Sequence, residues 1–467
     1  MSTPPGCAQH VALFPGAGMG HLIPFLRLAA ILSSRGCQVT LITAHPTVSL
    51  AESNHLSDFL SSHSAINHHH FHLLPISSHP SSTPIIDDPF FNQVYAIRRS
   101  LNNIRPILLQ SASPFSTLVI DILLADRIAA VLSDLPPLPN YILCTSSARF
   151  LALMSRLGST VLPADYSAGD VVDIPGLTTP VSKSSIPPPF TNPDHFFHAL
   201  LLDNARAFPL FDGILVNTFS GLEGIAVRVL NSGSVMQGLP PVLPIGPLPP
   251  IIHFRNQKQL TCTEWLDTQP ASSVVLLSFG SRTAMSKDQI QEIAKALITS
   301  KFAFVWIVKG SKVDRDDKDD LTKLLGEPFL KIIKSSRSGM VVNEWVNQES
   351  ILSHSAIGGF VSHCGWNSVT EAAARGVPVL AWPLHGDQKL NAEVVVEAGL
   401  GIWDESWGWG GERVVAADEI QRKLVELMED VQLKRMAASV GAEARRAVDV
   451  AGSSDLLLTH LVNRDSK

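Results

Sequence analysis

Residues 358–371 read GGFVSHCGWNSVTE, and their types and spacing suit the binding of an anion. An apolar, β-prone run ends at His363 and Gly365, small polar residues follow, and residues 369–375 have helical character up to Gly376. This pattern predicts a strand, a tight turn and a helix N-terminus, where free backbone N–H groups and the helix dipole attract negative charge. We therefore expect a ligand that carries phosphate.

His21 and Asp121 are candidates for proton transfer. His21 follows a glycine-rich turn at the predicted start of a helix, where the dipole disfavours imidazolium and leaves the ring available as a base. Asp121 interrupts an apolar run, residues 117–124, that predicts a buried strand. An unpaired buried carboxylate would cost several kcal/mol, so His21 is its expected partner and Asp126 is the fallback. Position alone leaves open that His21 merely caps the helix or is exposed.

The elements around these residues form the same pattern twice. Residues 10–15, 21–34 and 38–43 predict strand, helix and strand, which is the start of a parallel sheet. The proline-rich segment 240–250 marks a boundary, after which a strand at residues 273–279 starts the pattern again. We expect an α/β protein with two Rossmann-like doubly wound domains, residues 1–245 and 246–450, that face each other across a ligand cleft at the strand ends. Residues 451–467 are expected to pack back on the first domain.

Composition excludes several classes of function. The 467 residues suffice for two hydrophobic cores, and the net charge is −6 with dispersed Lys and Arg, which argues against nucleic acid or an anionic membrane as partner. The five cysteines are far apart and odd in number, which favours a reducing, cytoplasmic setting. No run of about 18 apolar residues predicts a membrane span. We expect a monomer.

Other interpretations compete at single motifs. The glycine-rich turn after the first strand is typical of nicotinamide binding, but the second strand ends in Thr43-Ala44-His45, without the acidic residue that holds a ribose. The histidines at positions 68, 69, 70 and 72 could suggest a metal, but consecutive strand residues point to alternate faces, and a solvated loop that enters a strand fits better. We expect no metal. A hydrolase is disfavoured because no Gly-x-Ser-x-Gly occurs.

The segment from Trp345 to Gln388 resembles, without a gap, the signature box of plant UDP-sugar-dependent glycosyltransferases, and His21, Asp121 and Ser281 match the family elsewhere. The resemblance implies the two-domain GT-B fold and no cofactor besides UDP-glucose as co-substrate. It also implies a donor site in which an aromatic ring stacks on uracil, a carboxylate holds the ribose, polar groups hold the diphosphate, and further residues face the sugar. The residues implied are Trp345, Val346 and Gln348 for uracil, Glu371 for ribose, His363, Gly365, Asn367, Ser368 and Ser281 for diphosphate, and Trp366, Asp387 and Gln388 for the sugar.

For the reaction, His21 would remove a proton from an acceptor hydroxyl while Asp121 orients the ring. The acceptor would attack the anomeric carbon from the face opposite UDP, so an α-linked donor would give a β product. The sequence is also similar to plant flavonoid C-glucosyltransferases, through the run that ends at His21, the Asp-Pro-Phe segment at residues 88–90, and the segment around His385. We expect the acceptor to contact Gly18, Asp88, Phe90, Thr145, Phe150 and Phe190.

The sequence favours C-glucosylation of a 2-hydroxyflavanone or a similar phloroglucinol-type ketone. Deprotonation of a phenol spreads negative charge to the ortho carbon, and the atom that lies about 3–3.5 Å from the anomeric carbon then reacts. O-glucosylation of a flavonoid or another small phenol is the alternative. A non-catalytic UDP-sugar binder would require His21 to be dispensable.

Overall fold

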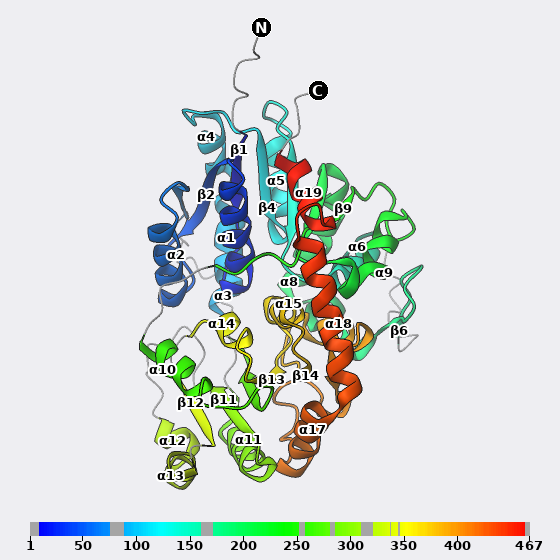
Figure 1. The fold of residues 1–467 in the computed structure, drawn as a ribbon. Helices are drawn as coiled ribbons and strands as arrows, with labels where there is room; N and C mark the ends of the chain where they lie inside the picture. The colour runs from blue at the N-terminus through cyan, green and yellow to red at the C-terminus, as the bar shows by residue number, and fades with distance from the viewer. Residues whose placement is uncertain are drawn as a thin grey trace. The chain divides into compact units, whose positions relative to one another are not determined.

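The computed structural model describes residues 9–74, 88–159, 171–251, 257–280, 285–309, 321–336, 338–343 and 346–462. The chain divides into two compact units, of which unit 1 comprises residues 1–252 and 447–467 and unit 2 comprises residues 253–446. Figure 1 shows both units with their elements labelled. The chain enters unit 2 after Ile252 and returns to unit 1 at Ala447.

Unit 1 is built on a parallel sheet of seven strands in the order β3-β2-β1-β4-β5-β8-β9. The inner strands are apolar because helices cover both faces of the sheet, whereas the edge strand β3 is polar and mostly exposed. Their bounds are β1 His10–Phe14, β2 Gln38–His45, β3 Asn67–His72, β4 Thr117–Asp121, β5 Asn140–Cys144, β8 Gly213–Val216 and β9 Val242–Pro244. A separate antiparallel pair is formed by β6 (Val171–Val172) and β7 (Val181–Ser182).

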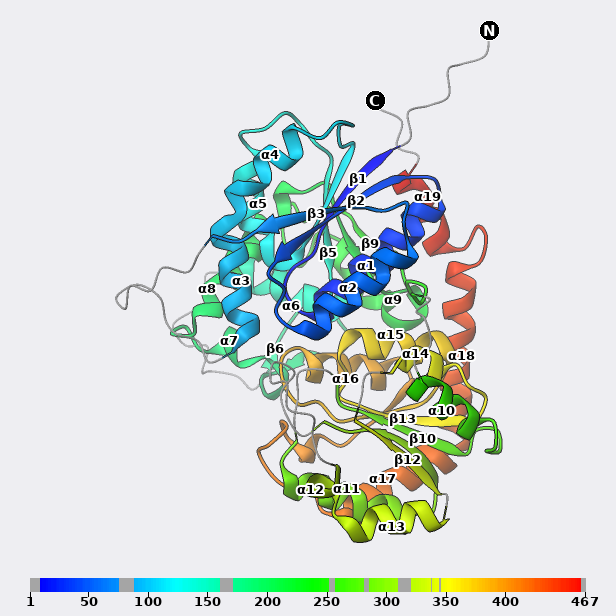
Figure 2. The same cartoon turned by 90° about the vertical axis from the view of Figure 1, so that its left-hand side faces the viewer.

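Helices α1, α2 and α19 pack on one face of this sheet, where their apolar side chains share a core with β1, β2, β4 and β5. The opposite side carries α3, α5 and α8 (Figure 2). The helices of unit 1 are α1 Met19–Ser34, α2 Leu50–Ser62, α3 Pro89–Ser100, α4 Ile104–Leu109, α5 Ala125–Leu132, α6 Ala148–Ser159, α7 Pro188–Thr191, α8 Phe196–Ala207, α9 Ser220–Asn231 and α19 Ser453–Val462.

Unit 2 contains a parallel sheet of six strands in the order β12-β11-β10-β13-β14-β15. This order is the doubly wound one, in which the chain moves outward from β10 in both directions and leaves a switch point between β10 and β13. The strands are β10 Val274–Ser278, β11 Ala303–Ile307, β12 Gly339–Val342, β13 Ile357–Ser362, β14 Val379–Ala381 and β15 Gly401–Trp403.

The helices of unit 2 also form two layers. Helices α11, α13 and α17 share a core with one face of the sheet, and α14, α15 and α16 lie on the other side (Figure 2). The bounds are α10 Gln257–Leu266, α11 Lys287–Ser300, α12 Leu321–Leu325, α13 Glu327–Ser336, α14 Gln348–Leu352, α15 Trp366–Arg375, α16 Gln388–Glu397, α17 Ala417–Glu429 and α18 Val431–Val448. The prediction of two doubly wound α/β domains is confirmed.

Several local predictions differ from the structure. The strand expected over residues 117–124 ends at Asp121 and continues as a 3₁₀ turn, Ile122–Leu124, so the carboxylate lies at the strand end rather than inside it. The proline-rich boundary segment contributes strand β9. Proline is tolerated there because β9 lies at the edge of the sheet, where fewer backbone N–H donors are needed. The segment 162–193 is rich in Pro, Ser and Thr, a composition that favours a surface loop, but its described part contains β6, β7 and α7. Residues 67–72, where a solvated loop that enters a strand was predicted, form strand β3 over their whole length.

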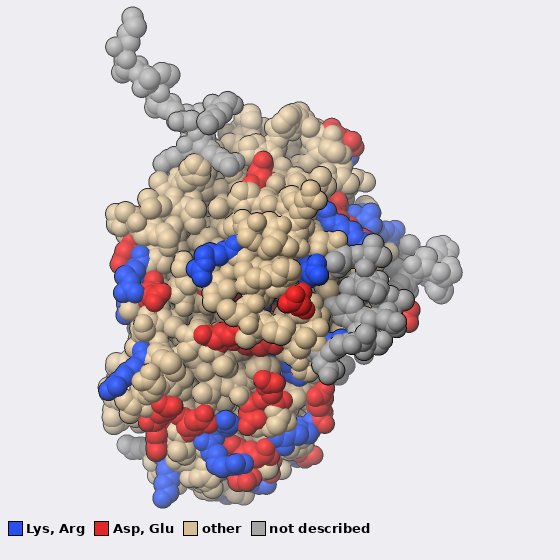
Figure 3. All heavy atoms as spheres, turned by 90° about the vertical axis from the view of Figure 1, so that its right-hand side faces the viewer, with Lys and Arg blue, Asp and Glu red and all other residues tan. Residues whose placement is uncertain are grey.

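The surface and the cysteines add three findings. On the face in Figure 3, acidic and basic side chains are interspersed. No helix in the described part of the chain is long and apolar enough to cross a membrane. Cys37, Cys144, Cys262 and Cys364 are buried free thiols, and Cys7 lies outside the described residues.

Candidate active site

His21 and Asp121 meet at the carboxyl ends of β1 and β4, which are neighbours in the sheet of unit 1. Asp121 Oδ2 lies 2.8 Å from His21 Nδ1, and Asp121 Oδ1 accepts a hydrogen bond of 2.9 Å from the Leu123 N–H. The carboxylate is fully buried, whereas the His21 side chain is 18% exposed. A proton on Nδ1 that is held by Asp121 leaves the Nε2 lone pair of His21 available as a base. Asp126, the fallback partner, pairs instead with Arg98.

Gly16 allows Asp121 to approach the turn between β1 and α1. A Cβ at this position would lie 2.8 Å from Asp121 Cγ, so any side chain would displace the carboxylate. His21 lies in the first turn of α1, whose N-cap is Gly18. The sequence marked this turn as glycine-rich, but the need for Gly16 in particular depends on the tertiary contact with Asp121.

Thr145 also contacts the base. Its Oγ1 lies 3.0 Å from His21 Nδ1, the nitrogen that faces Asp121. We had expected Thr145 to contact the acceptor, but this geometry places its hydroxyl where it helps to orient the imidazole ring. Thr145 directly follows β5, so its position depends on the pairing of β5 with β4.

The other predicted acceptor residues divide into two groups. The Phe90 ring lies 5.6 Å from the His21 ring, and Asp88 caps α3 by accepting a hydrogen bond of 2.9 Å from the Phe90 N–H. Phe150 and Phe190 contact each other edge to face at 5.8 Å. Phe190 is only 1% exposed, so its ring is buried. Phe91 and Phe197, which the sequence did not single out, extend the aromatic group beside Phe90.

The predicted phosphate loop in unit 2 lies between β13 and α15, at the switch point of the sheet. Gly365 is the N-cap of α15, and it has no side-chain cap that would compete with a ligand for the helix N–H groups. A Cβ at Gly365 or at Gly280 would lie 2.5 Å from His363 Nε2, so both glycines are needed for the position of this imidazole. Burial, followed by the charge of His385, lowers the pKa of His363 to about 3, so the ring is neutral near pH 7.

Gln348, Ser368 and Glu371 form one hydrogen-bonded group beside this loop. Gln348 Nε2 donates to Glu371 Oε2 at 2.8 Å and to Ser368 Oγ at 3.0 Å. All three side chains were predicted to bind the donor, and α14 and α15 bring them together. Val346 is buried, and Trp345 and Ser281 lie outside the described residues.

The residues predicted to face the sugar have different environments. Trp366 is only 3% exposed, so its side chain is buried. Gln388 Oε1 accepts hydrogen bonds from the Leu384 and His385 N–H groups at 2.8 and 3.0 Å, and these bonds hold the turn that precedes α16. Asp387 Oδ2 accepts a hydrogen bond of 3.0 Å from Asn391 Nδ2.

The sequence analysis missed Asn391. Its buried amide also donates to the Cys364 carbonyl at 3.0 Å, so one side chain joins the phosphate loop to the Asp387–Gln388 turn. Asn391 is four residues after Asp387, and this helical spacing was the available signal. Asn367 remains a predicted phosphate ligand at the start of α15.

Comparisons with known proteins identify the class. The model of the family described as UDP-glucoronosyl and UDP-glucosyl transferase matches residues 225–408. The rice protein UDP-glycosyltransferase CGT (Oryza sativa subsp. japonica) is 46% identical over 458 residues, which cover 96% of this chain and 94% of that protein. UDP-glycosyltransferase 708C1 of Fagopyrum esculentum is 46% identical over 455 residues, which cover 97% and 94%.

The crystal structure of LpCGTa in complex with UDP matches with a TM-score of 0.85 and 41% identity, over 98% of this chain and 99% of that one. The fold is therefore that of a glycosyltransferase with the GT-B fold. The chain belongs to the UDP-glycosyltransferase family.

Proposed function

We propose that this enzyme transfers glucose from UDP-glucose to carbon, with inversion, and that its acceptor is a 2-hydroxyflavanone or a related phloroglucinol-type ketone. The observation that carries the proposal is the His21–Asp121 pair with the Phe90 ring beside it, because this group combines a base with an aromatic surface. The similarity to the rice protein named CGT and to LpCGTa supports transfer to carbon.

The base would act at Nε2 of His21. Nε2 accepts the proton of an acceptor phenol, and Asp121 stabilises the imidazolium that forms, which contributes roughly 10²–10⁴ to the rate. The phenolate places negative charge on its ortho carbon, which forms a bond to the anomeric carbon as the bond from that carbon to the UDP oxygen breaks. UDP leaves with the electron pair of the broken bond. His21 then returns its proton to the oxygen that began as the phenolate, and the proton on the attacked ring carbon is lost to solvent, which restores aromaticity.

The predicted donor residues would hold UDP-glucose through contacts that suit its parts. The N–H groups at the start of α15 would stabilise the charge that develops on departing UDP. The Glu371 carboxylate suits a ribose diol, since a diol supplies two O–H donors. His363 would approach the diphosphate as a neutral imidazole because burial lowers its pKa to about 3.

The test incubates the purified enzyme with UDP-glucose and phloretin or a 2-hydroxyflavanone, heats the product in acid, and measures its mass. We expect a product one hexose heavier that survives acid and is lost in His21→Ala. The exposed His72 offers a matched control, and His72→Ala should retain activity. Release of the hexose by acid would instead establish the O-glucosyl alternative. Full activity of His21→Ala would refute the assignment of the base.

A further inference from the structure

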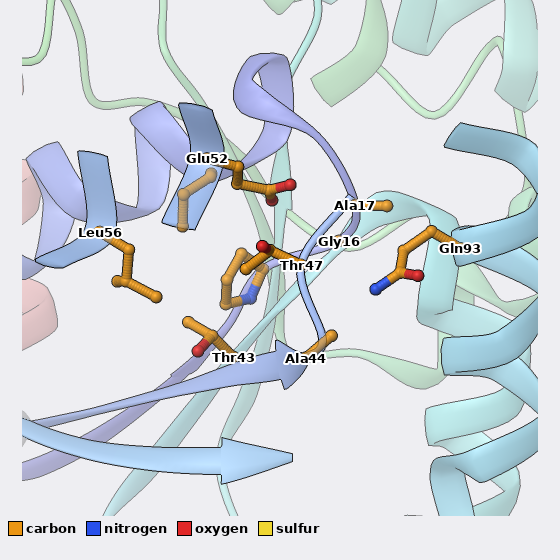
Figure 4. Close-up of a pocket in the computed structure, with 10 residues that line it drawn as sticks. Gly16, Ala17, Thr43, Ala44, Thr47, Glu52, Leu56 and Gln93 are labelled. Carbon is orange, nitrogen blue, oxygen red and sulfur yellow. The ribbon is translucent and has the colours of Figure 1, made fainter. Parts of the chain in front are cut away.

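Glu52, in the first turn of α2, lies against the turn that precedes His21. Its Oε1 accepts a hydrogen bond of 3.2 Å from the Gly18 N–H, and its Oε2 accepts one of 2.9 Å from the Val48 N–H. Figure 4 shows the carboxylate directed at the turn that contains Gly16 and Ala17. The side chain is 5% exposed, which is rare for a glutamate without partners. Glu52 therefore joins two loops that follow neighbouring strands, β1 and β2.

We propose that Glu52 is a positioning residue for His21, an inference that rests on the proposed function of His21 as the base. Gly18, the N-cap of α1, has φ of 83° and no side chain that could fix the turn. The His21 N–H donates to the Gly18 carbonyl at 3.0 Å, so the first turn of α1 starts from the residue whose N–H Glu52 holds. The carboxylate thus supplies from α2 the bond to the N-cap N–H that the N3 Glu or Gln of a capping box supplies in other helices.

Glu52 acts on His21 through its negative charge as well as through its hydrogen bonds. A helix N-terminus carries partial positive charge, which disfavours the imidazolium form of a histidine in the first turn. A carboxylate at the same N-terminus opposes that effect and so favours the imidazolium that forms during the reaction. Among the described residues, the acidic groups around this turn are Asp121 from β4, Asp88 at the N-cap of α3, and Glu52. Asp121 holds the ring directly, and Glu52 holds the backbone that carries it.

Glu52→Gln is the informative substitution because both carboxylate oxygens accept N–H bonds. An amide keeps only one acceptor oxygen, and its NH₂ group would face either the Gly18 or the Val48 N–H, so one of the two loops loses its anchor. Ser49→Ala is the matched control. The Ser49 hydroxyl caps the same helix by accepting a bond of 3.2 Å from the Glu52 N–H, and within the described part of the chain it makes no hydrogen bond to the α1 turn.

The experiment measures kcat, the pH dependence of kcat/KM, the Kd for UDP and Tm in wild type and both variants. For Glu52→Gln we expect kcat to fall by about tenfold or more and the pH profile to move to lower pH, because a negative charge near His21 is lost. The Kd for UDP should stay within about twofold, since the predicted UDP ligands lie in unit 2. Ser49→Ala should lower Tm but leave kcat and the pH profile unchanged.

A second measurement does not depend on the acceptor. The titration of the His21 ring is followed by NMR of protein labelled with ¹³C-histidine, and the signal is assigned by its absence in His21→Ala. Its midpoint should move to lower pH in Glu52→Gln and not in Ser49→Ala. An unchanged midpoint and an unchanged kcat in Glu52→Gln would overturn the inference, and so would a loss of kcat in Ser49→Ala as large as that in Glu52→Gln. If the wild type transfers no sugar, the proposed function is contradicted. The titration of His21 then still tests whether Glu52 positions this residue.

Discussion

Asp121 is held by two different donors, and this arrangement determines how its substitution should act. Oδ1 accepts from the Leu123 N–H, and Oδ2 faces His21 Nδ1. In Asp121→Asn the amide oxygen can stay on the Leu123 N–H only if the NH₂ group faces Nδ1. Nδ1 must then accept, which puts the ring proton on Nε2 and removes the lone pair that the reaction needs.

We therefore expect Asp121→Asn to lower kcat by about 10²–10⁴ with little change in Tm. The Kd for UDP, measured by calorimetry, should be unchanged, since the predicted UDP ligands lie in unit 2. Kinetics at saturating UDP-glucose provide the check, and a kcat within about threefold of wild type would show that the tautomer of His21 is not set by Asp121.

The contacts of a single residue could be predicted from the sequence where its side chain cannot be buried without a partner. A carboxylate in an apolar run needs a partner, and this requirement pointed from Asp121 to His21. Thr145, Gly16 and Glu52 were not identified as parts of the base assembly, because a hydroxyl, a glycine or a helical glutamate is common on protein surfaces. Their contacts arise from the order of β2, β1, β4 and β5 in the sheet, which the spacing of residues does not reveal.

At the scale of elements, Glu223 connects α9 to α6. Its carboxylate accepts bonds of 3.0 Å from the Ala148 and Arg149 N–H groups at the start of α6, and its own backbone is non-helical with φ of −137°. Burial raises the pKa of Glu223 to about 7, although the two N–H bonds act in the opposite direction. The folded protein therefore keeps a proton on this carboxyl at pH values where the unfolded chain has lost it.

The sign of the pH dependence follows from this difference in bound protons. Between the ordinary pKa of 4.5 and about 7, the folded state binds more protons, so the contribution of Glu223 to stability declines as pH rises. The free energy of unfolding of wild type minus that of Glu223→Gln should fall by up to about 3 kcal/mol across this window. Urea denaturation of both proteins from pH 4.5 to pH 8 measures this difference in unfolding free energy. A difference that stays constant over this range would contradict the raised pKa of Glu223.

Elements with strong apolar runs were predictable, and those that depend on tertiary partners were not. The strands β1, β10 and β13 follow from buried runs that end in glycine or polar residues. Helix α2 was missed because its mixed composition gives a weak apolar stripe, and only four of its residues are buried. Strand β9 was missed because proline normally argues against a strand, and its edge position removes that objection.

At the scale of the whole molecule, the chain ends by returning to the unit in which it began. Helix α19 packs its apolar face into the core shared by α1 and the sheet, and Leu458 is 2% exposed there. Arg35 forms an ion pair with Asp455, and the Ser454 hydroxyl donates to the Gly246 carbonyl at 2.6 Å. These contacts join α19 to α1 and to the segment that leaves unit 1. Residues 451–467 were expected to pack on the first domain, but a short terminal helix does not by itself indicate which surface it covers.

Leu458→Ala tests whether this return stabilises unit 1. Removal of a buried leucine side chain should cost about 2–5 kcal/mol, because the cavity adds to the lost burial. Leu456, which is 56% exposed on the same helix, offers the matched control, and Leu456→Ala should change stability by less than about 0.5 kcal/mol. Chemical denaturation measures both variants, and the Kd for UDP below the transition should be unchanged in each. Equal effects of the two substitutions would show that α19 does not contribute to the core in solution, whereas a large effect of Leu458→Ala alone would show that unit 1 depends on the end of the chain.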